Sequence, residues 1–350
     1  MTETNLKGKV QTVLGAVEPS TLGPTMTHEH LLIDFSCMFN EPDEATAYHR
    51  AHQPVTIDNL GWVSYHFFAN LDNLMLIDEK AAAAEATIYM KAGGGTIVDA
   101  TTIGIGRDPL ALARMARSTG MNIVMGAGYY VDAVHPNNMD DLTESQITQQ
   151  IIDEIRIGVG ETRVKAGIIG EIGCTWPLAP NERKVLRAAA LAQQETGAAI
   201  LIHPGRNPIA PREILDVLAE AGGDIERTIM GHLDRTITDT DDLLDLAKTG
   251  CYLEYDQFGL EVSYYSLGDQ DMPSDAQRLG FIQRLLAEGY RHRIVIAHDV
   301  FSKHRTVKYG GHGYAHILDN IVPRMRDKGF SVEEIDSIIV GNPARVLTFV

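Results

Sequence analysis

A short apolar run followed by a helix-like segment recurs eight times along the 350-residue chain, and this repetition limits the possible folds most. The runs are rich in β-branched residues, end in polar or glycine residues, and cover residues 25–34, 95–102, 122–130, 166–174, 198–205, 227–234, 251–258 and 293–300. Helix-like segments lie between them at residues 78–92, 108–119, 145–159, 181–196, 211–221, 239–249 and 274–288. Apolar strands that alternate with amphipathic helices are typical of a parallel sheet covered by helices. Eight such units favour an α/β fold of the (β/α)8 TIM-barrel type over an open doubly wound sheet.

No low-complexity linker or shift in composition divides the chain, so we expect a single barrel domain over residues 1–350. Residues 10–14 and 16–19 flank Gly15 and predict a short N-terminal hairpin at the bottom of the barrel. The connections 35–77 and 301–316 are long, and loops that follow barrel strands lie on the active face, so both are candidate lids. Surface packing is the alternative for the aromatic residues of the first connection, which are Trp62, Tyr65, Phe67 and Phe68.

The net charge of −17 limits the possible partners. An acidic surface repels phosphate backbones and anionic lipids, so we expect neither nucleic acid nor a membrane surface as a partner. Residues 1–9 are polar and do not resemble a secretory signal, and no apolar run reaches membrane-spanning length. The odd, widely spaced Cys37, Cys174 and Cys251 indicate reduced thiols, as in a cytoplasmic protein. Cys174 lies close to Glu171 and is a candidate ligand or nucleophile, although a buried structural thiol is favoured.

Six imidazole or carboxylate side chains stand where the predicted strands end: His28, His30, Glu171, His203, His232 and Asp299. Residues two apart in a strand point to the same side, so His28 and His30 should face the barrel interior while Glu29 points away. Polar groups buried at one mouth of a barrel are costly unless they are paired or bind a metal. Each histidine alone is more simply read as a hydrogen-bonded core residue, but their joint occurrence with two carboxylates favours a site for zinc or a similar transition metal.

We therefore expect two divalent ions as cofactors, Zn2+ in the first place, with Mn2+, Fe2+ or Co2+ also compatible. The predicted ligands are His28, His30 and Asp299 for one ion, His203 and His232 for the other, and Glu171 as a bridge. A hydroxide shared by the ions would be the nucleophile, because a metal lowers the pKa of bound water. Asp299 would be the catalytic residue that takes the proton and passes it to the leaving group. The neighbouring His298 should face away from the interior and have a structural role.

Several motifs resemble the phosphotriesterase branch of the amidohydrolase superfamily. They are Thr-His-Glu-His at 27–30, Gly-Glu-Ile-Gly at 170–173, His-Pro-Gly-Arg at 203–206, Gly-His-Leu-Asp-Arg at 231–235 and Ala-His-Asp at 297–299. Within that branch, the phosphotriesterase-related proteins, also called parathion hydrolase-related or resiniferatoxin-binding proteins, are most similar. Their signatures resemble Val-Gln-Thr-Val-Leu-Gly at 10–15, Cys-Tyr-Leu-Glu-Tyr-Asp at 251–256 and Lys-Tyr-Gly-Gly-His-Gly-Tyr at 308–314, so the likeness runs from about Lys7 to the end. It implies a barrel with a binuclear zinc-type site held by the same six ligands, and a homodimer is usual among such relatives.

One departure from true phosphotriesterases concerns the bridging ligand. Those enzymes use a carboxylated lysine, whereas this chain has Glu171, which is shorter and carries its charge without modification. Organophosphate hydrolysis is therefore not inherited from the resemblance. For this subgroup the resemblance implies an amidase that hydrolyses N-acetyltaurine and similar N-acyl amino acids or sulfonates. The alternatives are a lactonase or phosphoesterase with the same site, and a non-catalytic small-molecule binding protein.

Basic side chains follow several of the candidate ligands and could bind an anionic small-molecule substrate. Two divalent ions offset by two carboxylates and a hydroxide leave about one positive charge, which tolerates an anion. The candidates for binding a sulfonate or carboxylate are Arg206, Arg235, Lys303, His304 and Arg305, with ordinary surface charge as the alternative for each. Tyr130 ends the third predicted strand, where related lactonases have a tyrosine near the hydroxide, so the resemblance implies contact with substrate or hydroxide, with an ordinary packed aromatic residue as the alternative.

Overall fold

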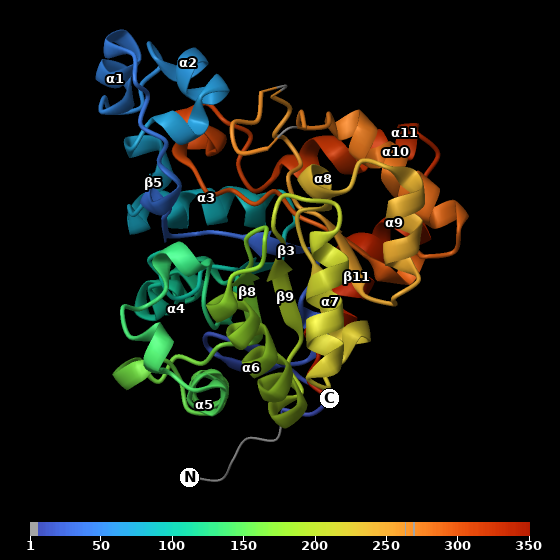
Figure 1. Ribbon diagram of the computed structural model, residues 1–350. Helices are drawn as coiled ribbons and strands as arrows, with labels where there is room; N and C mark the ends of the chain where they lie inside the picture. Colours follow the sequence, from blue (N-terminus) through green and yellow to red (C-terminus); the bar gives the residue numbers. More distant parts are fainter. Residues whose placement is uncertain (1–5, 263, 269) are drawn as a thin grey trace.

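Eight parallel strands form one sheet whose spatial order follows the chain in the computed structural model, which describes residues 6–262, 264–268 and 270–350. The strands are β3 (Thr25–Glu29), β6 (Thr96–Asp99), β7 (Asn122–Ala127), β8 (Ile168–Gly173), β9 (Ile200–His203), β10 (Thr228–Met230), β11 (Tyr252–Tyr255) and β12 (Ile294–Ile296). Each strand pairs with the next one along the chain, from β3 to β12. The predicted (β/α)8 barrel is confirmed (Figure 1).

Helices follow the strands and cover the outside of the sheet (Figure 1). They are α3 (Glu79–Lys91), α4 (Pro109–Thr119), α5 (Glu144–Arg156), α6 (Pro180–Thr196), α7 (Ala210–Glu220), α8 (Leu233–Thr236), α9 (Thr240–Ala247), α10 (Asp275–Ala287), α11 (Val322–Asp327), α12 (Val332–Asp336) and α13 (Asn342–Leu347). Their starts follow from the sequence, because side-chain oxygens of residues such as Asp78 and Asp108 accept hydrogen bonds from the first free backbone N–H groups. Gly120 and Gly197 end α4 and α6 in the left-handed conformation that glycine adopts without strain.

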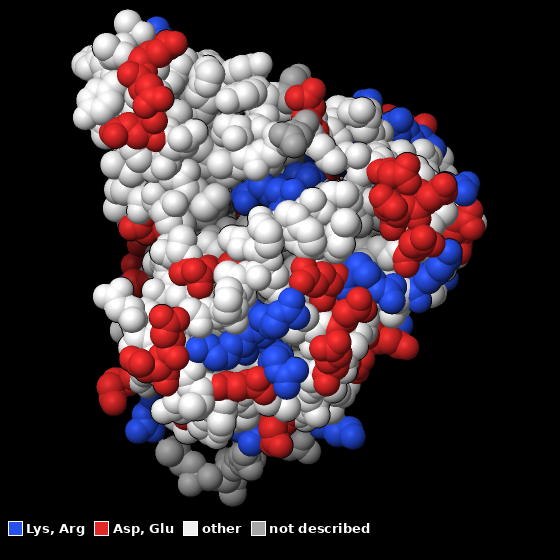
Figure 2. Space-filling view, viewed as in Figure 1, with Lys and Arg blue, Asp and Glu red and all other residues white. Residues whose placement is uncertain are grey.

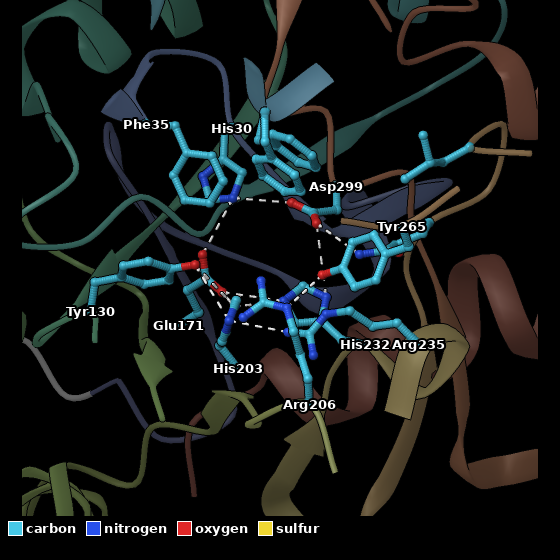
Figure 3. A pocket seen from close by; sticks show the side chains of 14 residues that line it. His30, Phe35, Tyr130, Glu171, His203, Arg206, His232, Arg235, Tyr265 and Asp299 are labelled. Atoms are coloured by element: carbon cyan, nitrogen blue, oxygen red, sulfur yellow. Dashed lines mark hydrogen bonds and ion pairs between the residues drawn. The ribbon is translucent and has the colours of Figure 1, made fainter. Parts of the chain in front are cut away.

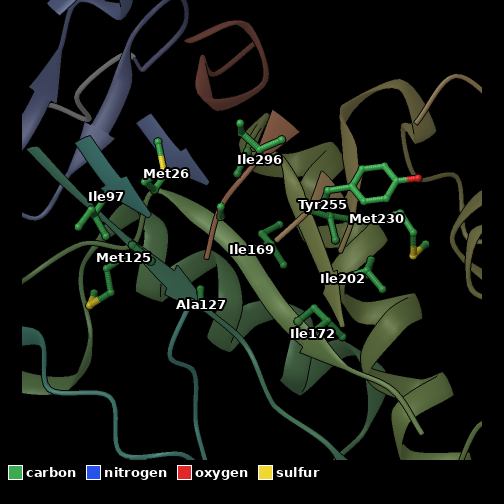
Figure 4. Packing of buried hydrophobic residues seen from close by; sticks show 14 of the residues in the cluster. Met26, Ile97, Met125, Ala127, Ile169, Ile172, Ile202, Met230, Tyr255 and Ile296 are labelled. Carbon is green, nitrogen blue, oxygen red and sulfur yellow. The ribbon is translucent and has the colours of Figure 1, made fainter. Parts of the chain in front are cut away.

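Strict alternation along the strands divides the core into two layers. Residues such as Val98, Leu201 and Val295 point into the barrel, where they form one buried cluster. Their neighbours, among them Ile97 and Ile202, point outward and pack beneath the helices (Figure 4). The barrel is therefore a filled core, and only its mouth is open for chemistry.

The predicted N-terminal hairpin is confirmed as β1 (Val10–Thr12) paired with β2 (Gly15–Val17). The side chain of Val10 belongs to the cluster inside the barrel. The Gln11 side chain donates one hydrogen bond to the backbone oxygen of Ile155, at 2.8 Å. It donates another to the backbone oxygen of Ala166, just before β8 begins, at 2.5 Å. The hairpin thus closes the end of the barrel where the strands start.

Two of the strands carry irregularities that matter for the site. The register between β8 and β9 shifts between Ile169 and Ile172, which both pack outward. With one extra residue between them, Glu171 faces inward instead of sharing the outward side with Ile169. A similar shift between Met26 and Glu29 in β3 turns His28 toward the interior.

The first and last strands meet along a seam held by side chains as well as backbone. The backbone N–H of Asp299 donates to the oxygen of His28 at 3.1 Å. The carboxylate of Glu29, which points away from the mouth as predicted, accepts from the backbone N–H groups of His298 at 2.8 Å and Val300 at 3.0 Å, and bonds His298 Nδ1 at 2.6 Å. His298 therefore has the structural position that alternation predicted.

The long connection after β3 protrudes beyond the active face. It contains α1 (Ala45–Ala51) and α2 (Leu60–Tyr65), seen at the upper left of Figure 1, and its base is closed where β4 (Ile33–Asp34) pairs with β5 (Met75–Leu76). Acidic side chains gather over α1 in Figure 2. Phe67 and Phe68 are buried against Phe35 and Phe301 above the mouth, so these two aromatic residues pack, while Tyr65 is half exposed.

Other predictions on composition can be compared with the structure. Cys37 is exposed, Cys174 and Cys251 are buried, and all three are free thiols. Among the described residues, no helix has the length and apolar character needed to cross a membrane.

Candidate metal centre

The six candidate ligands converge at the mouth of the barrel, at the carboxyl ends of its strands, and all of them except His28 are labelled in Figure 3. None of them exposes more than a few per cent of its surface, and they are His28, His30, Glu171, His203, His232 and Asp299. The stretches that carry them are far apart in the sequence, and only closure of the barrel brings them together.

Glu171 lies between two groups of ligand atoms. Its Oε1 is 3.3 Å from His30 Nε2. Its Oε2 is 2.9 Å from His203 Nδ1 and 3.6 Å from His232 Nε2. Asp299 Oδ1 lies on the side of His30, 3.3 Å from the same Nε2. His28 Nε2 also lies 3.4 Å from Oε2. Oε1 therefore faces His30, whereas Oε2 faces His28, His203 and His232, so the carboxylate lies among all four imidazoles.

His28 gives a direct test of whether these residues suit a cation. Its Nδ1 lies 3.2 Å from Glu254 Oε2 and 3.3 Å from Asp256 Oδ2, so this nitrogen carries a proton and Nε2 is left with a lone pair. That Nε2 is buried, makes no hydrogen bond within the described part of the chain, and faces Glu171 Oε2 at 3.4 Å and Asp299 Oδ1 at 4.0 Å. Atoms of His28, His30 and Asp299 lie within 4.8 Å of one another, close enough to bind one ion. Two carboxylates around a buried imidazole nitrogen call for a positive charge between them, either a proton or a metal ion, so these residues fit a metal ion.

A carboxylate also binds the outer ring nitrogen of a second candidate ligand, His232. His232 Nδ1 lies 2.9 Å from Asp256 Oδ1, which leaves Nε2 free, and this Nε2 is 2.8 Å from His203 Nδ1. A carboxylate bound to the outer nitrogen of a histidine fixes its ring and makes it a better metal ligand. His30 has a comparable partner, since its Nδ1 lies 2.9 Å from the Thr101 hydroxyl.

The electrostatics of the site favour added positive charge. Burial opposes protonation of His30, but hydrogen bonds with Asp299 and Glu171 outweigh it and raise the pKa of His30 to about 9. The pKa of His28 is also raised, because the Glu171 charge and the nearby Asp256 and Glu254 outweigh its burial. Carboxylates that hold protons on buried imidazoles would hold cations in their place.

Glu254 and Asp256 were not among the residues predicted from the sequence. They lie two apart at the end of β11, on the inward side with Tyr252, and both are fully buried. Asp256 also accepts from the backbone N–H of His232 at 2.7 Å, and burial raises the pKa of Glu254 to about 7. The alternation that identified His28 and His30 would also have identified this pair of carboxylates within an apolar run.

Two of the ligands sit on strained backbone. His232 has φ +55° and Asp299 has φ +52°, the left-handed region that residues with a side chain rarely adopt. Such conformations cost about 1–3 kcal/mol and cluster at functional sites. Arg305 supports the second one, because its guanidinium donates to the backbone oxygen of Asp299 at 2.6 Å.

A cavity with about 330 Å³ of empty space opens over the ligands (Figure 3). Its apolar wall consists of Phe35, Phe68, Leu260 and Phe301, and its polar wall of Tyr130, Arg206, Arg235, Gln257 and Tyr265. Basic side chains also appear in a hollow near the middle of the face in Figure 2.

Three of the six candidate substrate contacts, Tyr130, Arg206 and Arg235, line the cavity. Arg206 Nε donates to the Tyr265 hydroxyl at 2.6 Å, and Arg235 approaches His203 Nε2 at 3.1 Å. The Tyr130 hydroxyl lies 3.3 Å from His203 Nδ1, and burial raises the pKa of Tyr130, so it stays protonated.

Of the other three candidates, His304 and Arg305 lie outside the cavity lining. The His304 ring stacks on Phe67 with centroids 5.7 Å apart, and its backbone N–H donates to Asn73. Arg305 also donates to the backbone oxygens of His298 at 2.5 Å and Phe258 at 3.1 Å. These contacts hold the segment after β12, and we leave both residues out of the substrate set. Lys303, likewise outside the lining, pairs with Asp72 at 2.6 Å.

A (β/α)8 barrel with buried histidines and carboxylates grouped at the carboxyl ends of its strands defines the class of metal-dependent barrel hydrolases. Within that class, the chain belongs to the phosphotriesterase family, as the motifs predicted: the sequence model of this family matches residues 8–347. The chain is 50% identical to a protein of Salmo salar named N-acetyltaurine hydrolase, and the alignment covers 98% of this chain and 99% of that protein. A Homo sapiens protein of the same name is 48% identical over 99% of each chain. The crystal structure of a resiniferatoxin-binding protein from Rhodobacter sphaeroides superposes with a TM-score of 0.94, at 36% identity over 97% of this chain and 95% of that one.

Proposed function

We propose that the protein is a binuclear metal-dependent amidase that cleaves small N-acyl amines bearing an acidic group, of the N-acetyltaurine type. The central position of Glu171, whose Oε1 lies beside His30 and whose Oε2 lies beside His203, carries the proposal. The names of the two relatives quoted above support the choice of substrate.

The two proposed ions would share Glu171. One would be held by His28, His30 and Asp299, and the other by His203 and His232. Imidazoles with few carboxylates favour Zn2+, with Mn2+, Fe2+ and Co2+ as competitors. When bound, such ions supply a water of lowered pKa and polarise the acyl carbonyl.

Asp299 is the proposed proton carrier. Its Oδ1 faces His30, on the ligand side, while its Oδ2 is near Gln257 and 3.8 Å from His232 Nδ1. A carboxylate that uses one oxygen as a ligand can hold a proton on the other. Asp299 would deliver that proton to the departing nitrogen, which leaves as an amine.

The polar wall of the cavity is suited to the acidic end of the substrate. Arg206 and Arg235 lie on this wall, and a guanidinium binds the oxygens of a sulfonate or carboxylate through paired hydrogen bonds. Tyr130, protonated and close to His203, can donate to the oxygen of the acyl group. The aromatic wall would then contact the acyl chain.

The test is a set of assays on protein loaded with each of the four metals. We expect two metal ions per chain by elemental analysis, turnover of N-acetyltaurine, and loss of both on chelation. A lactone and paraoxon are the rival substrates; turnover of either with none of any acylated amine would overturn the amidase proposal. A non-catalytic binding protein would be favoured by two results together: the wild type turns over none of these substrates, and Asp299→Asn binds them as tightly as the wild type does.

The role of the polar wall has its own control. Arg206→Met should raise KM for N-acetyltaurine about tenfold or more, since it removes a charged hydrogen-bond donor. The uncharged analogue N-acetylethanolamine lacks the sulfonate, so its KM should not change. An equal effect on both compounds would remove Arg206 from the binding site.

A further inference from the structure

Gln257 lies just after β11 and lines the cavity beside Asp299, with only 3% of its surface exposed. Its side-chain Nε2 donates to Asp299 Oδ2 over a long 3.5 Å. An ionised carboxylate can only accept hydrogen bonds, so the NH2 group of the amide must face Asp299. The amide oxygen of Gln257 is thereby fixed on the opposite side.

That oxygen, Oε1, is buried and has no hydrogen-bond partner among the described residues. Arg206 Nε donates to the Tyr265 hydroxyl and Arg235 donates to the Pro204 oxygen at 3.2 Å, so neither of these hydrogen bonds reaches Oε1. A buried acceptor without a partner costs free energy that a ligand with a matching N–H or O–H group can recover. The position therefore indicates recognition of a donor on the substrate.

We infer that Gln257 Oε1 accepts a hydrogen bond from the N–H of the scissile amide and makes the site selective for secondary amides. This inference rests on the proposed amidase function and deepens it. The nitrogen that receives the proton from Asp299 must come close to Oδ2, and the Gln257 amide group is in contact with that same oxygen. Esters, lactones and N-alkylated amides have no N–H at this position and leave Oε1 unpaired.

The contact should also strengthen as the reaction proceeds. The acyl carbon gains an oxygen from water, its bond to nitrogen breaks, and the nitrogen keeps the bonding electron pair and takes up the proton of Asp299. The amine that results is a donor for which Oε1 is already in place. Gln257 thus acts as a specificity-determining residue, and part of its effect falls on kcat.

The experiment compares N-acetyltaurine with N-acetyl-N-methyltaurine, two amides whose leaving groups both need a proton. For the wild-type holoenzyme we expect kcat/KM to be at least tenfold higher for the N–H compound. Gln257→Met keeps the length of the side chain and removes both its oxygen and the NH2 group that donates to Asp299. In this variant, kcat/KM for the N–H compound should fall about tenfold, or roughly 1.4 kcal/mol. The value for the N-methyl compound should stay within about threefold, because both compounds lose the long contact with Asp299 but only the N–H compound loses the hydrogen bond to Oε1.

Leu260→Met is the matched control, since Leu260 lines the same cavity with an apolar side chain; it should change both substrates alike. A wild-type ratio below about three overturns the inference, and this measurement does not depend on any variant folding. The inference is also overturned if Gln257→Met, with normal metal content, lowers kcat/KM equally for both substrates. Such a result would mean that the substitution acts through Asp299. If the wild type turns over neither compound, the amidase proposal fails and the inference with it.

Discussion

Replacing Arg305 tests whether this arginine supports the metal centre or contacts substrate. Its guanidinium is buried and donates to three backbone oxygens, those of His298, Asp299 and Phe258. A hydrogen bond made by a charged group contributes about 1.5–3 kcal/mol, but burial of the charge offsets part of that sum. We expect Arg305→Met to lower the free energy of unfolding by about 3–5 kcal/mol, the range found when one partner of a buried charged network is removed.

This loss can be converted to a change in melting temperature. Unfolding entropy is about 2.1 cal/mol/K per residue, so the 350 residues give about 0.7 kcal/mol/K. The Tm of the metal-loaded protein should therefore fall by about 4–7 °C in thermal unfolding followed by circular dichroism. Arg305→Lys should recover little, because an ammonium group cannot span three carbonyls as the planar guanidinium does.

Arg206→Met is the matched control, since this arginine lines the cavity and, among the described residues, its side-chain hydrogen bond goes to Tyr265. It should raise KM and shift Tm by about 1 °C or less. The reasoning is refuted if Arg305→Met keeps the wild-type Tm and raises KM instead, which is the result that a substrate contact would give.

Three further predictions concern other parts of the site. Asp256→Asn should weaken metal binding about 10–100-fold in competition with a chelator, because it removes the carboxylate that orients His232; unchanged affinity would contradict this. Gly170→Ala should destabilise the protein by about 3 kcal/mol or more in urea unfolding, because its Cβ would lie 2.1 Å from the Leu201 oxygen at a φ of +119°; stability like that of the wild type would count against the close contact. Burial, reinforced by a neighbouring guanidinium, lowers the pKa of His304 to about 3, so the unfolded chain binds a proton that the folded one does not, and stability falls as pH drops below about 6.5. Between about pH 7 and pH 5 the wild type should lose about 2 kcal/mol more than His304→Phe, and parallel curves for the two proteins would rule this out.

The repeat of apolar runs was sufficient to predict the barrel, because strand and helix alternation leaves few other topologies. The inward direction of Glu171 was less accessible. Counting alternate residues from the inward-facing Ile168 would place Glu171 on the outside, and only the shift in register before Ile172 reverses that. Such a shift depends on how β8 and β9 pair, which no single strand encodes.

The residues around the ligands were harder to predict for a related reason. Arg305 follows Asp299 closely, so proximity in sequence suggested a contact with substrate, but its guanidinium turns back to the backbone of the same segment. Gln257 carries no charge and belongs to no metal motif, so nothing marked it until its buried oxygen was seen beside Asp299. Side-chain direction in loops depends on tertiary contacts, whereas strand ends follow from the pattern of the chain.

The seam between β3 and β12 has a consequence for how the protein matures. His28 leaves the ribosome early, whereas Asp299 and the His298 backbone that Glu29 binds appear only after about 270 more residues. Until then His28 and His30 lack Asp299, and the barrel has an open side. The group of His28, His30 and Asp299 is therefore complete only after the C-terminal strand has docked, and a chain released short of residue 299 would present the other candidate ligands without this carboxylate.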